Sequence, residues 1–163
     1  MELKKFTRLS MLLALSVVLS MIESIIPILS GIIPGFKIGL ANTVVLYVLY
    51  VYGFKDAFKI SILKVFLTAI LKTGLFSISF FLSLGGAILS IIAMFIFKKI
   101  FKLSIIGTSV TGSVFHCIGQ ILVAMYVLNL INIIYYLPII IVLAIPTGMI
   151  VGLISKELIN NIK

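Results

Sequence analysis

The chain has 163 residues, of which 63% are hydrophobic and only 10% are charged, and its formal net charge is +9. A soluble domain contains about 45–50% apolar and about 25% charged residues, so this composition excludes a soluble globular domain and predicts an integral membrane protein. The basic residues flank the apolar runs, which indicates membrane topology and not a nucleic-acid-binding face.

Apolar runs follow one another along the whole chain, without a linker or a convincing repeat. A membrane-spanning helix needs about 20 mainly apolar residues. We therefore expect an all-α domain over residues 1–163 with six transmembrane helices, and the first is expected to be a retained span because it lacks a small-residue cleavage site. The predicted spans are residues 9–29, 38–52, 57–71, 76–97, 105–130 and 135–154.

The basic residues predict the orientation of these spans. With a cytoplasmic N-terminus, ten of the 13 basic residues lie on the cytoplasmic side. Only Lys37, after the turn at Pro34-Gly35, and Lys72 fall outside, whereas Lys64 lies within a span. The positive-inside rule then predicts that both termini are cytoplasmic.

Polar residues inside the predicted spans cluster at a similar depth, in the outer half of the membrane. A charge at the membrane centre costs about 2.5–3.5 kcal/mol on insertion scales, so each needs a reason. Lys64, Thr68 and Lys72 share one helix face, because they are spaced by four residues, and so do His116 and Gln120. The candidate substrate-binding residues are Glu23, Lys37, Asn42, Lys64, Lys72, His116 and Gln120.

These residues predict an outward-facing pocket with a positive potential. Lys37 and Lys72 would attract an anion and Asn42 would bind it by hydrogen bonds, together with His116 and Gln120. Glu23 would keep Lys64 charged and in position. Structural alternatives stay open: Glu23 and Lys64 form a buried pair, His116 packs against a neighbour, or Lys72 extends to the lipid headgroups. The small residues of the fifth run also suit close helix packing.

The residues needed for most enzymatic chemistry are missing. The chain has four acidic residues, and Glu23 is the only one well inside a span. No carboxylate pair can hold Mg²⁺ over a diphosphate, the single Asp is far from His116, and there is no phosphate-binding P-loop. One His and one Cys make a poor metal site. We therefore expect neither an enzyme nor a cofactor.

A resemblance to a known family is carried by Glu23 and four segments, residues 34–42, 104–113, 116–120 and 136–138, and two of these segments contain its specific parts. Residues 34–42 (Pro-Gly-Phe-Lys-Ile-Gly-Leu-Ala-Asn) and 116–120 (His-Cys-Ile-Gly-Gln) resemble the Gx transporter family, which is also labelled heptaprenyl diphosphate synthase component I. The resemblance covers nearly the whole chain, although the family usually has Asn where this chain has Cys117. The family is similar to the S-components of energy-coupling factor (ECF) transporters, which are six-helix proteins.

The resemblance implies an S-component-like, multi-pass protein in the plasma membrane of a prokaryote. Its function would be to bind a small, anionic, vitamin-like or prenyl/quinone-related solute for uptake. An ECF-type coupling protein and ATPases would be its partners, docked on small residues such as Ser10, Ala14 and Val18 of the first helix. The alternative is a non-catalytic membrane accessory subunit of a heptaprenyl diphosphate synthase.

Overall fold

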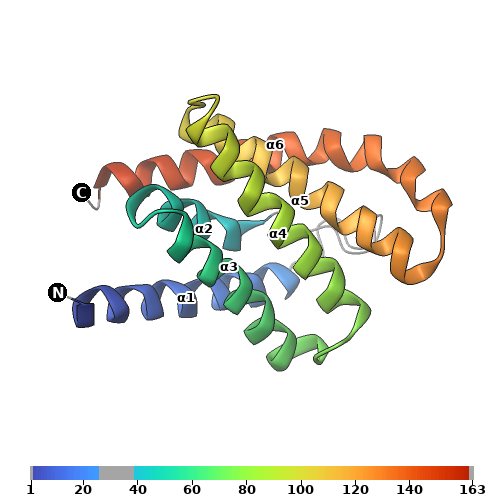
Figure 1. Cartoon of the computed structure of the whole chain (residues 1–163), viewed down its shortest axis with the longest axis horizontal. Helices are drawn as coiled ribbons and strands as arrows, with labels where there is room; N and C mark the ends of the chain where they lie inside the picture. Colours follow the sequence, from blue (N-terminus) through green and yellow to red (C-terminus); the bar gives the residue numbers. More distant parts are fainter. Residues whose placement is uncertain (1, 26–38, 162–163) are drawn as a thin grey trace.

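The computed structural model describes residues 2–25 and 39–161, and these residues form helices joined by turns, with no strand among them. Helix α1 begins and helix α6 ends at the same end of the molecule (Figure 1). A π-helical turn, η1, continues α3, and a 3-10 helix, η2, precedes α6. The elements are α1 (Glu2–Ile25), α2 (Leu40–Val51), α3 (Phe54–Thr68), η1 (Ala69–Thr73), α4 (Ile78–Lys99), α5 (Ile105–Leu128), η2 (Ile131–Tyr136) and α6 (Leu137–Asn161). The all-α prediction is confirmed.

Four helical segments are long and apolar enough to cross a membrane. They are Leu3–Glu23, Ile78–Lys99, Ile105–Leu128 and Ile131–Asn161. They are compatible with a multi-pass membrane protein. The predicted count of six spans is not confirmed, because only these four segments among the described residues meet the criterion. The first of these helices begins well before residue 9, because the basic residues at its start are themselves helical.

The predicted second span, residues 38–52, differs most from the structure. The described helix there, α2, has 12 residues, which is about 18 Å of helix, whereas the hydrocarbon core is about 30 Å thick. Leu46, Val48 and Leu49 are fully buried, and the helix contacts α1, α3, α4 and α6. Its apolar residues are therefore covered by protein, which hydropathy cannot distinguish from cover by lipid.

Glycines let α4, α5 and α6 approach one another closely. A Cβ atom on Gly119 of α5 would lie 2.6 Å from the carbonyl oxygen of Gly85 in α4. On α6, Cβ atoms on Gly148 and Gly152 would lie 2.8 Å from the Cα atoms of Val110 and Ile106 in α5. Small residues at such crossings are typical of helix packing in membranes, where close backbone contact replaces the hydrophobic effect. The packing role expected for the small residues of the fifth run is thus observed at Gly119.

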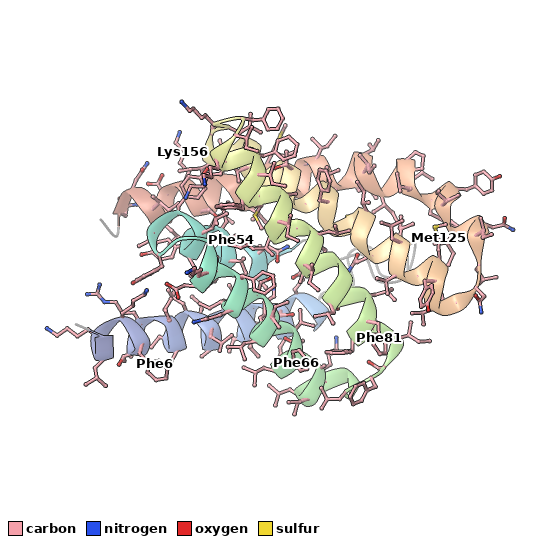
Figure 2. All side chains as sticks on the ribbon, viewed as in Figure 1. Phe6, Phe54, Phe66, Phe81, Met125 and Lys156 are labelled. Atoms are coloured by element: carbon pink, nitrogen blue, oxygen red, sulfur yellow. The ribbon has the colours of Figure 1, made fainter. Side chains whose placement is uncertain are left out.

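Large apolar side chains cover much of the outer surface. Met11 on α1 is 67% exposed and Val142 on α6 is 66% exposed. Phe6 likewise projects outward from α1 (Figure 2). Apolar exposure on this scale marks a surface that another apolar phase covers, in agreement with helices that face lipid.

Basic residues at the end where α1 begins are used in packing. Lys5 forms an ion pair with Asp56 at the start of α3, with 2.7 Å between Nζ and Oδ2. The Nζ of Lys98 donates a hydrogen bond to the carbonyl oxygen of Leu49 at 2.8 Å and lies 4.1 Å from the centre of the Tyr50 ring. Because Leu49 is in the last turn of α2, Lys98 satisfies a helix C-terminal carbonyl and complements the negative end of the helix dipole.

Candidate functional site

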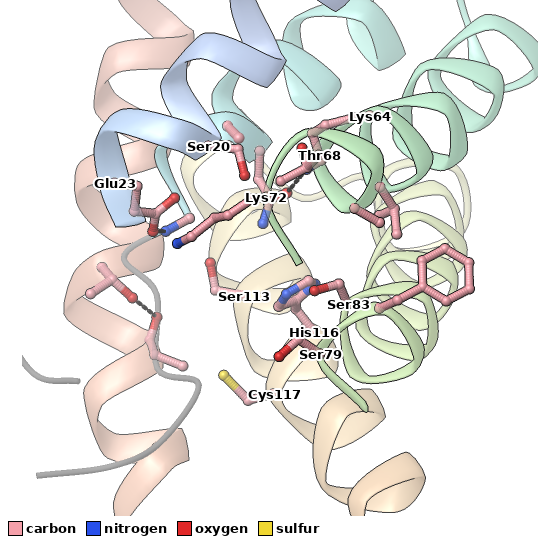
Figure 3. A pocket seen from close by; sticks show the side chains of 18 residues that line it. Ser20, Glu23, Lys64, Thr68, Lys72, Ser79, Ser83, Ser113, His116 and Cys117 are labelled. Carbon is pink, nitrogen blue, oxygen red and sulfur yellow. Dashed lines mark hydrogen bonds between the residues drawn. The ribbon is translucent and has the colours of Figure 1, made fainter. Parts of the chain in front are cut away.

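A polar pocket lies between helices α1 to α6, at the ends of α1 and α3 and the beginning of α2 and α4 (Figure 3). Its volume is about 70 Å³, which is room for a few water molecules or a small polar group. Its polar and charged lining residues come from every one of these helices: Ser20, Glu23, Asn42, Lys64, Thr68, Lys72, Ser79, Ser83, Ser113, His116, Cys117 and Thr147.

Glu23 and Gly39 join the end of α1 to the beginning of α2. The Glu23 side chain is buried, and its Oε1 accepts a hydrogen bond from the backbone N–H of Gly39. Gly39 is the N-cap residue of α2 and has a positive φ of 85°, a conformation that glycine adopts without strain. A carboxylate at this position meets the unsatisfied N–H groups and the positive end of the α2 dipole.

Lys64 and Asn42 form the second polar contact of the pocket. Lys64 lies in the middle of the helical path of α3 and η1 and is only 7% exposed. Its Nζ donates a hydrogen bond to Oδ1 of Asn42 at 2.8 Å. An ammonium group inside a membrane protein is stable only with such partners, so this contact explains how the chain tolerates Lys64.

The π-helical turn η1 shapes the rim of the pocket. Lys72 lies in this turn and is exposed, although it also lines the pocket. One turn earlier, the buried hydroxyl of Thr68 has no hydrogen-bond partner among the described residues. Single π-helical turns are frequent at functional sites because they displace side chains from the regular helical spacing. This segment therefore offers the exposed ammonium group of Lys72 and the buried hydroxyl of Thr68 to the pocket.

His116 enters the pocket wall from α5 because α4 has a glycine beside it. A Cβ atom on Gly86 would lie 2.9 Å from both Nδ1 and Cε1 of the imidazole ring. The ring is therefore packed against α4 and also lines the pocket, next to Ser83 and Ser113 (Figure 3). The packing and pocket-lining interpretations of His116 are compatible.

The structure brings together five of the seven candidate residues, and these are Glu23, Asn42, Lys64, Lys72 and His116. Gln120 is not among the lining residues, and Lys37, with the turn at Pro34-Gly35, lies outside the described residues. Ser79 and Ser83 of α4 and Thr147 of α6 also line the pocket, although they were not among the residues predicted from the sequence. The spacing of four residues between the two serines was a usable signal, because it places both on one helix face.

These features define a class of protein: a helical membrane protein with a pocket between its helices that is lined by hydroxyl, amide and charged side chains. The family model for heptaprenyl diphosphate synthase component I matches residues 12–158. The chain belongs to this family. Comparison with curated proteins and with solved structures gives no significant match.

Proposed function

We propose that the protein is a non-catalytic membrane protein that binds a small anionic solute in this pocket and serves as the membrane component of a heptaprenyl diphosphate synthase. The observation that carries the binding role is the enclosure of Lys64, Lys72, Asn42 and His116 around one cavity. The family supports the association with a synthase. Its catalytic partner would be a separate, soluble protein.

The composition of the pocket favours binding over catalysis. Glu23 is the single carboxylate among the described lining residues, and it is already used in the contact with Gly39. The described residues contain no group of three or more His, Cys, Asp or Glu side chains that could hold a metal ion. Prenyl transfer from a diphosphate requires neutralisation of the leaving group, usually by Mg²⁺ held on carboxylates. We therefore assign that chemistry to the partner.

The polar residues have three roles in this proposal. Lys72, exposed at the rim, attracts the anion. Lys64, held by Asn42, fixes its position deeper in the pocket. His116 and the neighbouring serines then provide hydrogen bonds. Lys37 and Gln120 remain predicted contacts of the solute.

A second candidate function is solute uptake, in which the protein is the substrate-binding subunit of an ECF-type transporter. The pocket is lined by residues of helices α1 to α6, which favours this candidate, since a free solute needs a site that shields it from lipid. With cytoplasmic termini and six spans, the pocket would open outward in the plasma membrane of a prokaryote. Ser10, Ala14 and Val18 lie on α1, where Ala14 and Val18 are exposed, and would face a coupling protein that carries the ATPases.

Purification from native membranes tests the proposal and separates the two candidates. Mild solubilisation, chemical cross-linking and native mass spectrometry should show a retained small molecule that is lost from the Lys64→Met and Lys72→Met variants. A cross-linked soluble synthase would support the first candidate, and cross-linked ATPase subunits would support the second. A wild-type protein that retains and binds no small molecule would overturn the binding role itself.

A further inference from the structure

The pocket has an apolar wall as well as polar groups. Val65, Ala69 and Phe80 form this wall and come from α3, η1 and α4. They belong to one buried hydrophobic cluster, so the wall lies where α3 and η1 pack against α4. Other helices contribute polar groups to the same pocket, such as Asn42 and His116. A lining with both characters favours a ligand that is itself part polar and part apolar.

Phe80 connects this wall to the outer surface of the bundle. Its ring is 4% exposed and makes edge-to-face contacts with the rings of Phe66 and Phe81, with 5.1 and 5.4 Å between the ring centres. A third ring, that of Phe76, lies 6.2 Å away. These three neighbours are exposed, on the side of α3 and α4 where Figure 2 labels Phe66 and Phe81. One buried ring therefore lies between the pocket and a group of surface rings.

Phe76 is held in this aromatic group at a cost to its backbone. Its φ is 65°, in the left-handed region, which a bulky side chain rarely adopts. Phe76 is 76% exposed, so burial within the protein offers little compensation. Strained residues of this kind are often found at ligand-binding sites. The ring needs an apolar partner outside the described protein, either lipid or a ligand, and its contact with Phe80 of the pocket wall favours a ligand.

The volume of the pocket limits how much of a ligand it encloses. About 70 Å³ has room for a small polar group, so a chain attached to that group has to continue outside the cavity. We infer that the solute is an amphiphile, with an anionic head group in the pocket and an apolar chain that passes Phe80 and lies against the exposed rings of Phe66, Phe76 and Phe81.

This inference rests on the proposed binding role and deepens it, because it names the class of solute. The head group would contact Lys64 and Lys72, as in the proposed function, and the chain would add contacts that no polar solute makes. Such a molecule partitions into the bilayer and would reach the pocket from the lipid, between α3 and α4.

Photo-crosslinking with a ten-carbon chain that carries a terminal diazirine tests where the chain lies. Two probes are used, one with a carboxylate and one with a diphosphate head group, on the full chain in a nonionic detergent with EDTA. Labelled residues are identified by mass spectrometry after proteolysis. At least one probe should label residues 73–81 at least tenfold more than residues 2–10, which include Phe6, a ring that is 70% exposed. An excess of 3-methylbut-2-enoate or dimethylallyl diphosphate, matched to the head group of the probe, should reduce this labelling at least tenfold.

The alcohol with the same chain is the control for contact with lipid-facing residues in general, and it should show no preference for residues 73–81. Phe76→Ala should reduce the labelling of this segment at least threefold, whereas Phe6→Ala, at a similarly exposed ring on α1, should leave it unchanged. Labelling that is spread over the exposed apolar residues and is not reduced by the short competitors would overturn the chain contact. In that case, binding of a short competitor in isothermal titration calorimetry would leave the binding role intact. Failure of every probe and competitor to bind would overturn both.

Discussion

The bundle contains two groups of helices that are held together differently. Helices α4, α5 and α6 meet through glycines, and their backbones touch, as at Gly85 and Gly119. Helices α1, α2 and α3 meet around Glu23, Asn42 and Lys64, which also line the pocket. Stability should therefore depend on shape in the first group and on compensated polar groups in the second. At Glu23, Asn42 and Lys64 of the second group, stability and ligand binding are expected to change together.

The largest effect is expected from stranding one charge between α1 and α3. Glu23→Gln or Lys64→Met alone should lower the free energy of unfolding by about 3–5 kcal/mol, because the partner charge remains buried. The double variant should lose less than the sum of the two. Thermal unfolding in detergent measures the cycle, and simple addition of the two single effects would show that the residues are not paired. Retained solute binding in the double variant would make the pair purely structural.

The second largest loss of stability is expected from a substitution where α4 and α5 touch. Gly119→Leu should destabilise the protein by about 3 kcal/mol, because its side chain would overlap the backbone of Gly85. Thermal unfolding monitored by circular dichroism would measure the loss. Gly107→Ala is the control on the same helix, since its Cβ would make an ordinary contact of 3.4 Å with Leu103. Equal melting temperatures for Gly119→Leu and wild type would refute the close approach of these helices.

A moderate effect is expected at the C-terminus of α2. Lys98→Met removes a hydrogen bond to the Leu49 carbonyl and a cation–π contact with Tyr50, and should cost about 1–2 kcal/mol. Lys102→Met, at an exposed position nearby in sequence, should change stability by less than about 0.5 kcal/mol. The test is to measure the free energy of unfolding of both variants. If Lys102→Met lowers it as much as Lys98→Met does, the effect comes from the change in net charge alone.

Cysteine substitutions at exposed positions are expected to change stability least. Their labelling tests the membrane topology. In a Cys117→Ser background, Asn132→Cys should react with an impermeant maleimide added outside intact cells. Lys102→Cys should react only after the membrane is opened, because the predicted cytoplasmic side carries the basic residues. Both positions are exposed in the structure. The opposite pattern would reverse the predicted orientation and the outward opening of the pocket.

Much of this architecture could be predicted from hydropathy, since long apolar runs with basic flanks become helices. Helix α5 begins at residue 105, where hydropathy places the start of the fifth predicted span, and Ser104 caps it by accepting a hydrogen bond from the N–H of Gly107 at 3.2 Å. The shortness of α2 was not predictable, because an apolar run looks the same whether protein or lipid covers it.

The pocket was predictable where polar residues stand out in apolar helices, as Glu23 and Lys64 do. Gln120 was expected to join His116 because the two share a helix face. Gln120 is not among the described lining residues, and one residue before it Gly119 brings the backbones of α5 and α4 into contact. Spacing along one helix carries no information about how closely its neighbour approaches. The serines of α4 were not predicted to line the pocket, because a serine hydroxyl in a helix usually bonds to the backbone of its own helix and so gives no sign of a binding site.

The burial of α2 has a consequence for how the protein is made. The residues that enclose this helix include Ile159, near the end of α6, so its cover is complete only when almost the whole chain has left the ribosome. Until then, α2 is an apolar segment too short to be held stably by the bilayer on its own. We therefore expect this segment to insert late or to be protected by a membrane chaperone until α6 is in place. Chains that end before α6 should be recognised by membrane proteases through exposed α2, even though their longer helices are already inserted.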